Sequence, residues 1–285
     1  MSQTLADALR HATAILEQSG LDSARIDAEL LLAFVLERDR AWLRTWPEAP
    51  LSAAQQQHFE ALLQRRRQGE PVAYILGQRA FWSLDLKVTP ATLIPRPETE
   101  LLVEEALKRI PQTAEWTIPD LGTGSGAIAL AIARERPRCT LIATDRSAAA
   151  LRIARQNARD NDIDNIRFLA GDWLRPFAPG FQTGMILCNP PYVRQDDPHL
   201  ERGDLRFEPR SALAAGAEGL DDLQRIIADA PTHLKPGGWL LLEHGYHQQA
   251  AVERLLAQQG YHPLHCLPDL AGQPRLSLAQ WPGGR

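Results

Sequence analysis

The strongest constraint on the fold is the alternation of short apolar runs with helical stretches from residue 116 onward. Runs with strand character cover residues 116–120, 141–144, 166–170, 185–188 and 239–243, and a helix is expected over 127–135. This alternation predicts βαβ units, and therefore a mostly parallel sheet with helices on both faces. The last run, 276–279, has no helix after it, so we expect it to lie antiparallel at or near an edge of the sheet.

The tetrad Asn189-Pro190-Pro191-Tyr192 directly follows the run 185–188, so it is expected at the carboxyl end of a strand. Open α/β sheets bind their ligands at these ends. The two prolines fix two φ angles and remove two backbone donors. An amide oxygen, a rigid carbonyl and an aromatic face then form a receptor for a flat NH2 group, which methyl transfer to a planar nitrogen requires. The alternative is a proline-stiffened turn capped by the asparagine.

A glycine-rich turn follows the first strand, and its candidate cofactor-binding residues are Gly122, Thr123, Gly124, Ser125 and Gly126. Glycines allow a sharp turn and a close approach of backbone to ligand, and the helix N-terminus beyond offers free N–H groups. Asp145 ends the next strand, where a carboxylate can bind both hydroxyls of a ribose. Because the turn also fits a loose dinucleotide pattern, these residues indicate a nucleoside cofactor without identifying it.

Asp172 and Trp173 close the third strand. The carboxylate can accept a hydrogen bond from an adenine amino group, and the indole offers an apolar wall; a turn aspartate beside a core tryptophan is the alternative. The tetrad distinguishes a methyl-donor cofactor from a nicotinamide cofactor, because methyl transfer to nitrogen needs an amine receptor and hydride transfer does not. We therefore expect S-adenosylmethionine over the glycine-rich turn, with its sulfonium methyl directed at Asn189.

The histidines do not indicate catalysis or metal binding. None is placed to act as a general base, and His244 and His247 are expected in a loop. His262, His265 and Cys266 lie in an expected strand, where alternation directs His265 away from the other two. Because this leaves too few ligands for a metal site, no metal is expected.

The first seventy residues are expected to form a small helical bundle. Leu5, Leu9, Ala12 and Leu16 have helical spacing, and Ser52 with Gln55 forms a capping-box pattern. We divide the chain into a helical docking domain (1–71), a β-hairpin linker (72–95) and a catalytic domain (96–285).

Composition limits the partners and the compartment. A net charge of −4 counts against nucleic acid, which basic surfaces bind. The dense basic cluster, Arg65-Arg66-Arg67, is expected as a solvated helix end favoured by the helix dipole. With no membrane-length apolar run, no signal segment and no CxxC spacing among three cysteines, the chain is expected in the reducing cytoplasm, away from membranes.

The chain resembles the class I S-adenosylmethionine-dependent methyltransferases, and among them the bacterial protein-(glutamine-N5) methyltransferases that modify peptide chain release factors. The resemblance spans nearly the whole chain, although Gln273-Pro274 departs from the usual pair before Arg275. The Arg-Pro-Glu-Thr-Glu form at 96–100 separates it from the sister enzymes that act on a ribosomal protein. The matching segments are 94–100, 120–126, 189–192, 208–210 and 269–272.

The resemblance implies a Rossmann-like domain with a seven-stranded sheet and assigns the site. The turn at 122–126, Asp145 and Trp173 would contact S-adenosyl-L-methionine. Asn189, Pro190, Pro191 and Tyr192 would hold the substrate, which is the glutamine of the Gly-Gly-Gln loop of a class I release factor. Catalysis would rest on the oxygens of Asn189 and Pro190 and on the ring of Tyr192, and the enzyme, expected as a monomer, would modulate translation termination.

Three other functions share parts of this pattern. A nucleic-acid amino-methyltransferase would use the same tetrad on adenine, although the low basicity of the chain and its helical domain argue against that. A nicotinamide-dependent oxidoreductase would use the glycine-rich turn. A binding protein without catalysis would retain the fold, although an intact tetrad argues against it.

Overall fold

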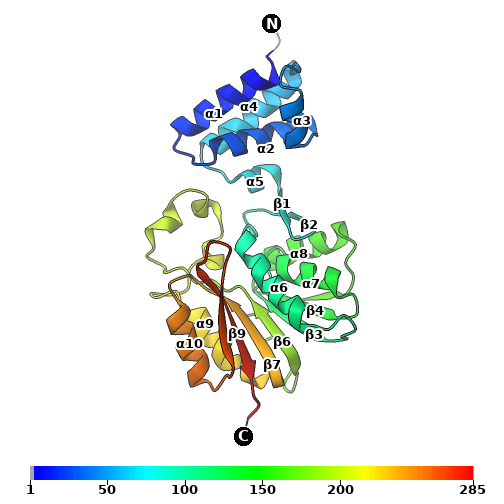
Figure 1. The fold of residues 1–285 in the computed structure, drawn as a ribbon, viewed down its shortest axis with the longest axis vertical. Coiled ribbons are helices and arrows are strands. Elements are labelled where there is room, and N and C mark those ends of the chain that lie inside the picture. The colour runs from blue at the N-terminus through cyan, green and yellow to red at the C-terminus, as the bar shows by residue number, and fades with distance from the viewer. Residues whose placement is uncertain (1–2, 285) are drawn as a thin grey trace. The chain divides into compact units, whose positions relative to one another are not determined.

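The computed structural model describes residues 3–284 and divides them into two compact units. The helical unit comprises the chain up to residue 78 together with 201–207, and the sheet unit comprises 79–200 and 208 onward (Figure 1). The excursion 201–207 lies far along the chain from the helices, and local spacing gave no indication of it. Within residues 3–284, no helix combines the length and the apolar character that crossing a membrane requires.

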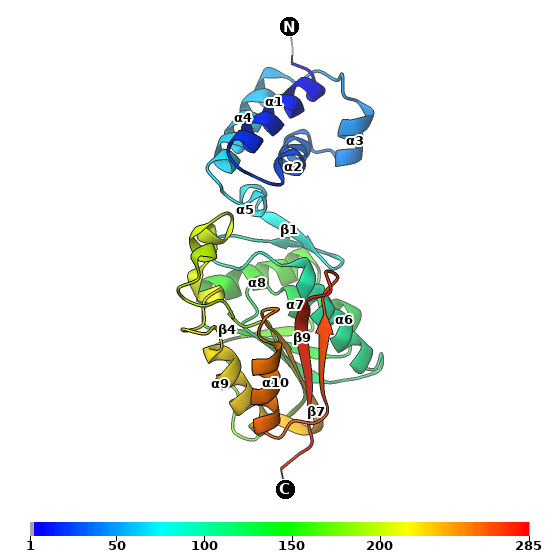
Figure 2. The ribbon, with the colours of Figure 1, turned by 60° about the vertical axis from the view of Figure 1, so that its left-hand side comes forward.

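The helical unit follows the expected pattern and adds two short helices. The capping box of Ser52 and Gln55 is present at the start of the fourth helix, and Thr4 caps the first. Figure 2 shows the first and fourth helices side by side. The elements are α1 (Leu5–Gln18), α2 (Ala24–Leu36), α3 (Arg40–Thr45), α4 (Ala53–Arg67) and α5 (Val72–Leu76), of which α3 and α5 were not anticipated.

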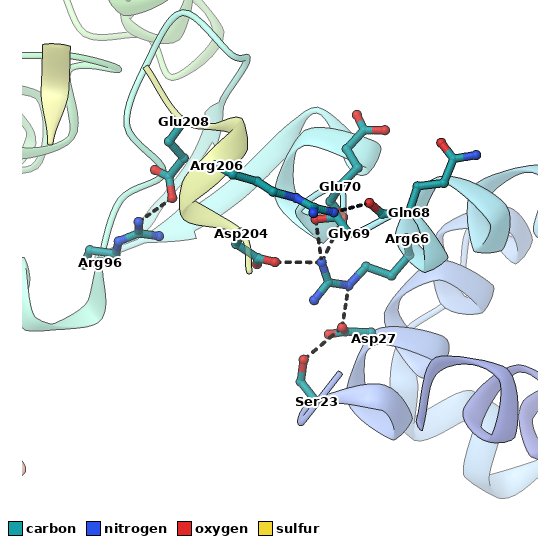
Figure 3. A network of polar contacts seen from close by, with 10 residues as sticks. All are labelled: Ser23, Asp27, Arg66, Gln68, Gly69, Glu70, Arg96, Asp204, Arg206 and Glu208. Atoms are coloured by element: carbon teal, nitrogen blue, oxygen red, sulfur yellow. Dashed lines mark hydrogen bonds and ion pairs between the residues drawn. The ribbon is translucent and has the colours of Figure 1, made fainter. Parts of the chain in front are cut away.

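The expectation of a solvated basic helix end is wrong for Arg66, which is 4% exposed. Its Nε donates to Asp27 of α2 at 2.7 Å, and its Nη1 donates to Asp204 at 2.7 Å (Figure 3). The backbone carbonyl of Glu70 accepts a further bond at 3.0 Å, and Arg206 donates to the carbonyl of Gln68. Arg66 therefore joins α2, α4 and the segment 201–207 within one unit.

The sheet unit begins with the expected hairpin, β1 (Gln78–Phe81) and β2 (Leu84–Lys87). Leu84 and Leu86 are buried while Asp85 and Lys87 are exposed, so the two faces of β2 differ in burial. The chain then enters a 3-10 turn, η1 (Pro97–Thr99), and continues into α6 (Glu100–Arg109).

The seven-stranded sheet has the order β5-β4-β3-β6-β7-β9-β8. β3 to β7 run parallel, and β9 pairs antiparallel with β7 on one side and β8 on the other. The expectation of an antiparallel last strand near an edge is confirmed. The strands are β3 (Thr117–Leu121), β4 (Thr140–Asp145), β5 (Ile166–Ala170), β6 (Thr183–Cys188), β7 (Leu234–Glu243), β8 (Leu264–Pro268) and β9 (Pro274–Trp281).

Helices cover both faces of this sheet (Figure 1). Met185 and Leu187 of β6 pack into one core with α6 and α7, while Ile186 and Cys188 pack into the other with α9 and α10. Alternate side chains of one strand thus serve opposite faces, as a sheet buried on both sides requires. The remaining helices are α7 (Ala127–Glu135), α8 (Ala148–Asp160), α9 (Asp221–Asp229) and α10 (Gln249–Gln258).

Arg66→Ala is expected to destabilise the helical unit by about 3–5 kcal/mol, because it leaves the buried carboxylate of Asp27 without its counterion. Urea unfolding followed by far-UV circular dichroism measures the change. Arg65→Ala is the matched control, because Arg65 pairs with Glu70 on the surface, where such pairs contribute below about 1 kcal/mol. Equal effects of the two substitutions would contradict a structural role for Arg66.

Candidate active site

The parallel register brings the carboxyl ends of five strands to one edge of the sheet. Leu121 of β3 aligns with Thr144 of β4 and with Cys188 of β6. The strand order reverses between β3 and β6. The chain adds β4 and β5 on one side of β3, and it adds β6 and β7 on the other side. Such a switch point leaves a crevice outside the strand ends, where open α/β sheets bind ligands.

A cavity of about 210 Å³ lies at this edge. Several of the residues expected at the site line this cavity, namely Gly122, Gly124, Asp145, Asp172, Trp173, Asn189 and Pro191. Thr123, Ser125, Gly126, Pro190 and Tyr192 are not among the lining residues. The structure therefore brings together side chains from the ends of β3, β4, β5 and β6, as the strand assignments implied.

The glycine-rich turn passes close to the indole of Trp173. A Cβ at Gly122 would lie 2.9 Å from that ring, and Gly122 has a φ of 70°, which L side chains rarely adopt. Asp145 holds the turn, because its Oδ2 accepts the N–H of Gly124 at 3.0 Å. Its Oδ1 accepts the N–H of Ser147 at 2.8 Å, and each oxygen keeps a second lone pair for a ligand.

The other residues of the turn support it from behind. The Thr123 hydroxyl donates to Asp120 Oδ2 at 2.6 Å, and Asn157 Nδ2 donates to the carbonyl of Ser125 at 2.8 Å. Gly126 has a φ of 89° and stands at the N-cap of α7. The structure thus places Thr123, Ser125 and Gly126 where they shape the turn.

Asp120 is a buried carboxyl group beneath the turn. It is 1% exposed, and this burial raises its pKa from the ordinary 3.8 to about 7. The hydrogen bond from Thr123 lowers the pKa and offsets part of that effect. Its Oδ1 has no hydrogen-bond partner among residues 3–284. An ionised carboxylate in such surroundings is costly, so the group is poised to hold a proton near neutral pH.

Trp173 and Asp172 occupy the end of β5 as expected, and both already have protein partners. Trp173 adopts a φ of 51°, which is uncommon for a residue with a side chain. Its Nε1 donates to Asp222 of α9 at 3.1 Å, and Asp172 pairs with Arg225 of the same helix at 2.7 Å. These contacts fix the indole in the cavity wall, since α9 holds both residues.

Asn189 of the tetrad lines the cavity and is held by a polar network. Its Nδ2 donates to Thr99 Oγ1 at 3.1 Å, and that hydroxyl donates to Glu243 Oε2 at 2.7 Å. The Tyr192 hydroxyl donates to Glu243 Oε1 at 3.2 Å. Burial raises the pKa of Glu243, and the hydrogen bonds from Thr99 and Tyr192 partly offset this. Burial likewise raises the pKa of the Tyr192 phenol.

Two further segments, to which sequence reasoning gave no role in the site, also line the cavity: residues 91–93, and Pro209 with Ser211 and Ala212. Glu208 ties them together, because it accepts the N–H of Ile94 at 3.0 Å and pairs with Arg96 (Figure 3). This contact also gives Arg96 a partner that its position at a helix start did not reveal. A glutamate between two loops has no local spacing signal, and only the fold joins them.

The histidines are not gathered into a site. His244 and His247 lie in the loop after β7, as expected. His244 is buried there, and its Nε2 lies 2.9 Å from Ser277 Oγ. Within residues 3–284, no group of three His, Cys, Asp or Glu side chains could hold a metal ion.

The cavity fits an elongated nucleoside ligand. The glycine turn leaves room that a Cβ at Gly122 would take up, and Asp145 retains acceptor capacity beside it. Trp173 supplies an apolar wall, and Asn189 adds an amide to the same lining. The arrangement can bind a nucleoside and present a second, planar group to it.

Comparisons with known proteins identify the family of the chain. Residues 7–77 match a family described as "PrmC N-terminal domain", and residues 97–203 match "Methyltransferase small domain". A release factor glutamine methyltransferase of Xylella fastidiosa (strain Temecula1) is 51% identical over 91% of this chain and 94% of its own length. One from Vibrio cholerae is 48% identical over 99% and 98%.

The solved structures show the fold. The crystal structure of a methyltransferase from Pyrococcus furiosus, with 18% sequence identity, has a TM-score of 0.54 and covers 78% of this chain and 98% of its own. The catalytic domain of human Mettl16, in complex with an RNA hairpin and 18% identical, has a TM-score of 0.55 and covers 72% of this chain and 77% of its own. These solved structures therefore share the fold described here.

The proton on Asp120 predicts a pH dependence of stability. Between the ordinary pKa of 3.8 and the folded value of about 7, the folded chain binds more protons than the unfolded chain. The free energy of unfolding therefore falls as pH rises through this window, by up to ~4 kcal/mol from this group. Urea unfolding of the ligand-free protein at several pH values measures this dependence. In Asp120→Asn the free energy of unfolding is expected to fall less with pH, whereas Asp164→Asn, on the surface, should behave as the wild type. An undiminished loss in Asp120→Asn would refute the assignment.

Proposed function

The chain belongs to the release factor glutamine methyltransferase family, and we propose that it methylates the side-chain amide nitrogen (N5) of the glutamine in the Gly-Gly-Gln loop of a peptide chain release factor. The observation that carries the proposal is the position of Asn189, whose amide lines the cavity beside the glycine turn. A hydride-transfer enzyme has no use for such an amide receptor.

The residues around the cavity suit S-adenosylmethionine, which supplies a methyl group on a positively charged sulfur when bound. Asp145 would accept from the ribose hydroxyls through its remaining lone pairs. Gly122 and Gly124 would let the backbone approach the ligand, and Trp173 and Asp172 would flank the adenine. Thr123, Ser125 and Gly126 would shape the turn rather than contact the ligand directly, since they lie outside the cavity lining.

Asn189 and Pro190 would hold the acceptor amide. An amide nitrogen shares its lone pair with its carbonyl and is a poor nucleophile. The Asn189 side-chain oxygen and the Pro190 carbonyl would each accept one N–H, so that the lone pair points along the line of transfer. Placing the reacting atoms about 3–3.5 Å apart removes an entropic barrier, and the two carbonyl dipoles stabilise the positive charge that grows on nitrogen.

Pro191 and Tyr192 would support this receptor. Pro191 lies in the cavity wall and stiffens the turn. The ring of Tyr192 would pack against the amide plane. Its hydroxyl donates to Glu243 and would hold the tetrad against the end of β7. No general base is required, because the proton becomes acidic once the nitrogen is methylated.

The helical unit would bind the release factor, and the match of residues 7–77 to a domain shared by the family supports this. The enzyme would act as a monomer in the cytoplasm, where translation termination takes place. It would have no direct contact with nucleic acid, in keeping with its net charge of −4.

Incubation with a release factor and methyl-labelled S-adenosylmethionine tests the function. We expect mass analysis of the Gly-Gly-Gln peptide to place one methyl group on the glutamine side chain. A release factor with Gln→Glu at that position is the matched control and should receive no label. Label on RNA or DNA, with none on the release factor, would instead establish a nucleic-acid amino-methyltransferase.

Asn189→Ala is expected to reduce single-turnover methyl transfer by at least about a hundredfold, because it removes one of the two acceptors that orient the amide. The affinity for S-adenosylmethionine should remain nearly unchanged by calorimetry. Gln112→Ala removes a surface amide outside the cavity and should behave as the wild type. Full activity in Asn189→Ala would refute the receptor.

Asp145→Ala is expected to weaken the binding of S-adenosylmethionine by about tenfold or more, because it removes the ribose contacts and the support of the turn at Gly124. Isothermal calorimetry measures the dissociation constant. Asp164→Ala removes an exposed carboxylate outside the cavity and serves as the control. An unchanged dissociation constant in Asp145→Ala would show that this carboxylate does not contact the ribose.

A further inference from the structure

We propose that Thr99 and Glu243 are positioning residues that turn the Asn189 amide so that its oxygen, not its nitrogen, faces the acceptor. Both belong to the sheet unit, at the end of η1 and at the end of β7. The inference rests on the proposed function, because it concerns how the same receptor is oriented. Its residues lie outside the cavity lining and act through Asn189.

The hydrogens of the network follow with Glu243 as a carboxylate, each of whose two oxygens accepts a hydroxyl. An ionised carboxylate only accepts hydrogen bonds, and a threonine hydroxyl has one hydrogen to donate. Thr99 lies 2.7 Å from Glu243 Oε2, so its hydrogen is committed to that carboxylate. Toward Asn189, at 3.1 Å, the same hydroxyl can only accept. The amide must therefore present its NH2 to Thr99.

This orientation decides the chemistry of the receptor. The oxygen and nitrogen of a carboxamide occupy opposite branches, so an NH2 directed at Thr99 leaves Oδ1 on the other side. An amide turned the other way would place an NH2 against the NH2 of the substrate, and donor would face donor. Asparagine orientation is normally set by the surrounding hydrogen bonds, and here Glu243 sets it through a single hydroxyl.

The burial of the network makes the orientation strong. Thr99 is 4% exposed and Glu243 is 2% exposed, so water cannot readily replace a lost partner. Tyr192 occupies the second oxygen of Glu243 at 3.2 Å. The carboxylate therefore joins two residues of the tetrad, because it binds Tyr192 directly and Asn189 through Thr99.

Thr99→Val and Thr99→Ser test the first link. Valine keeps the shape of the side chain and removes the hydroxyl, and we expect kcat for release factor methylation to fall by about tenfold or more, the equivalent of one hydrogen bond of this kind. The dissociation constant for S-adenosylmethionine should be unchanged, and the KM for release factor should change less than kcat. Serine restores the hydroxyl and should restore kcat to within about threefold of the wild type.

Thr183→Val is the matched control, because it removes a buried hydroxyl of β6 that bonds to the carbonyl of Thr117. It is expected to lower stability and leave kcat unchanged. An unchanged kcat in Thr99→Val, or an equal loss of kcat in Thr99→Ser and Thr99→Val, would overturn the proposal.

Glu243→Leu tests the second link. Without the carboxylate, the Thr99 hydroxyl is released to donate to Asn189 Oδ1, and the preference for the productive orientation is lost. We expect kcat to fall while the affinity for S-adenosylmethionine is retained. A Glu243→Leu variant with the kcat of the wild type would remove Glu243 from the proposal.

A measurement without turnover separates this inference from the proposed function. The side-chain amide of Asn189, assigned by its absence from the NMR spectrum of Asn189→Ala, should show one slowly exchanging hydrogen in the wild type. Thr99→Val should lose that protection, and Thr99→Ser should keep it. Equal, fast exchange of both hydrogens in the wild type would overturn the inference. Protection without methylation of release factor would instead refute the proposed function alone.

Discussion

Parallel hydrogen bonding along β3 is the constraint on which the rest of the molecule depends. β3 pairs with β4 on one side and with β6 on the other, so three strands end at one level. The glycine turn, Asp145 and Asn189 follow these three ends and meet for that reason alone. Because helices cover both faces, a ligand can reach the residues only from the edge, where the cavity lies.

Buried charge has a different use in each unit. In the helical unit, Arg66 joins two helices to a returning segment through two carboxylates. In the sheet unit, Glu243 accepts two hydroxyls and forms no ion pair within residues 3–284. A buried carboxylate satisfied by neutral donors directs the hydrogens of its neighbours, whereas a buried ion pair fixes the position of elements. Glu243 is thus suited to orienting Asn189, and Arg66 to assembling helices.

Much of the fold could be predicted, because it follows from local periodicity. The helix at Ala127–Glu135 and the strand at Ile166–Ala170 have the bounds that were expected. The short helices α3 and α5 carry too few residues to show a period. Arg66 was expected in solvent because the helix dipole favours cations at a helix C-terminus. The acids that pair with it, Asp27 and Asp204, lie far away in sequence.

The sequence by itself determined the alternation of strands and helices, the turn at Gly122–Gly126 and the tetrad at Asn189, because each is encoded in neighbouring residues. Tertiary structure alone decided which of these residues line the cavity, and that Glu208, next to the lining residue Pro209, binds Ile94 and Arg96. It also decided that Thr99 and Glu243, 144 positions apart, meet beside Asn189. The physical reason is that hydrogen bonds between distant segments depend on strand order and register, and no local pattern encodes the partner.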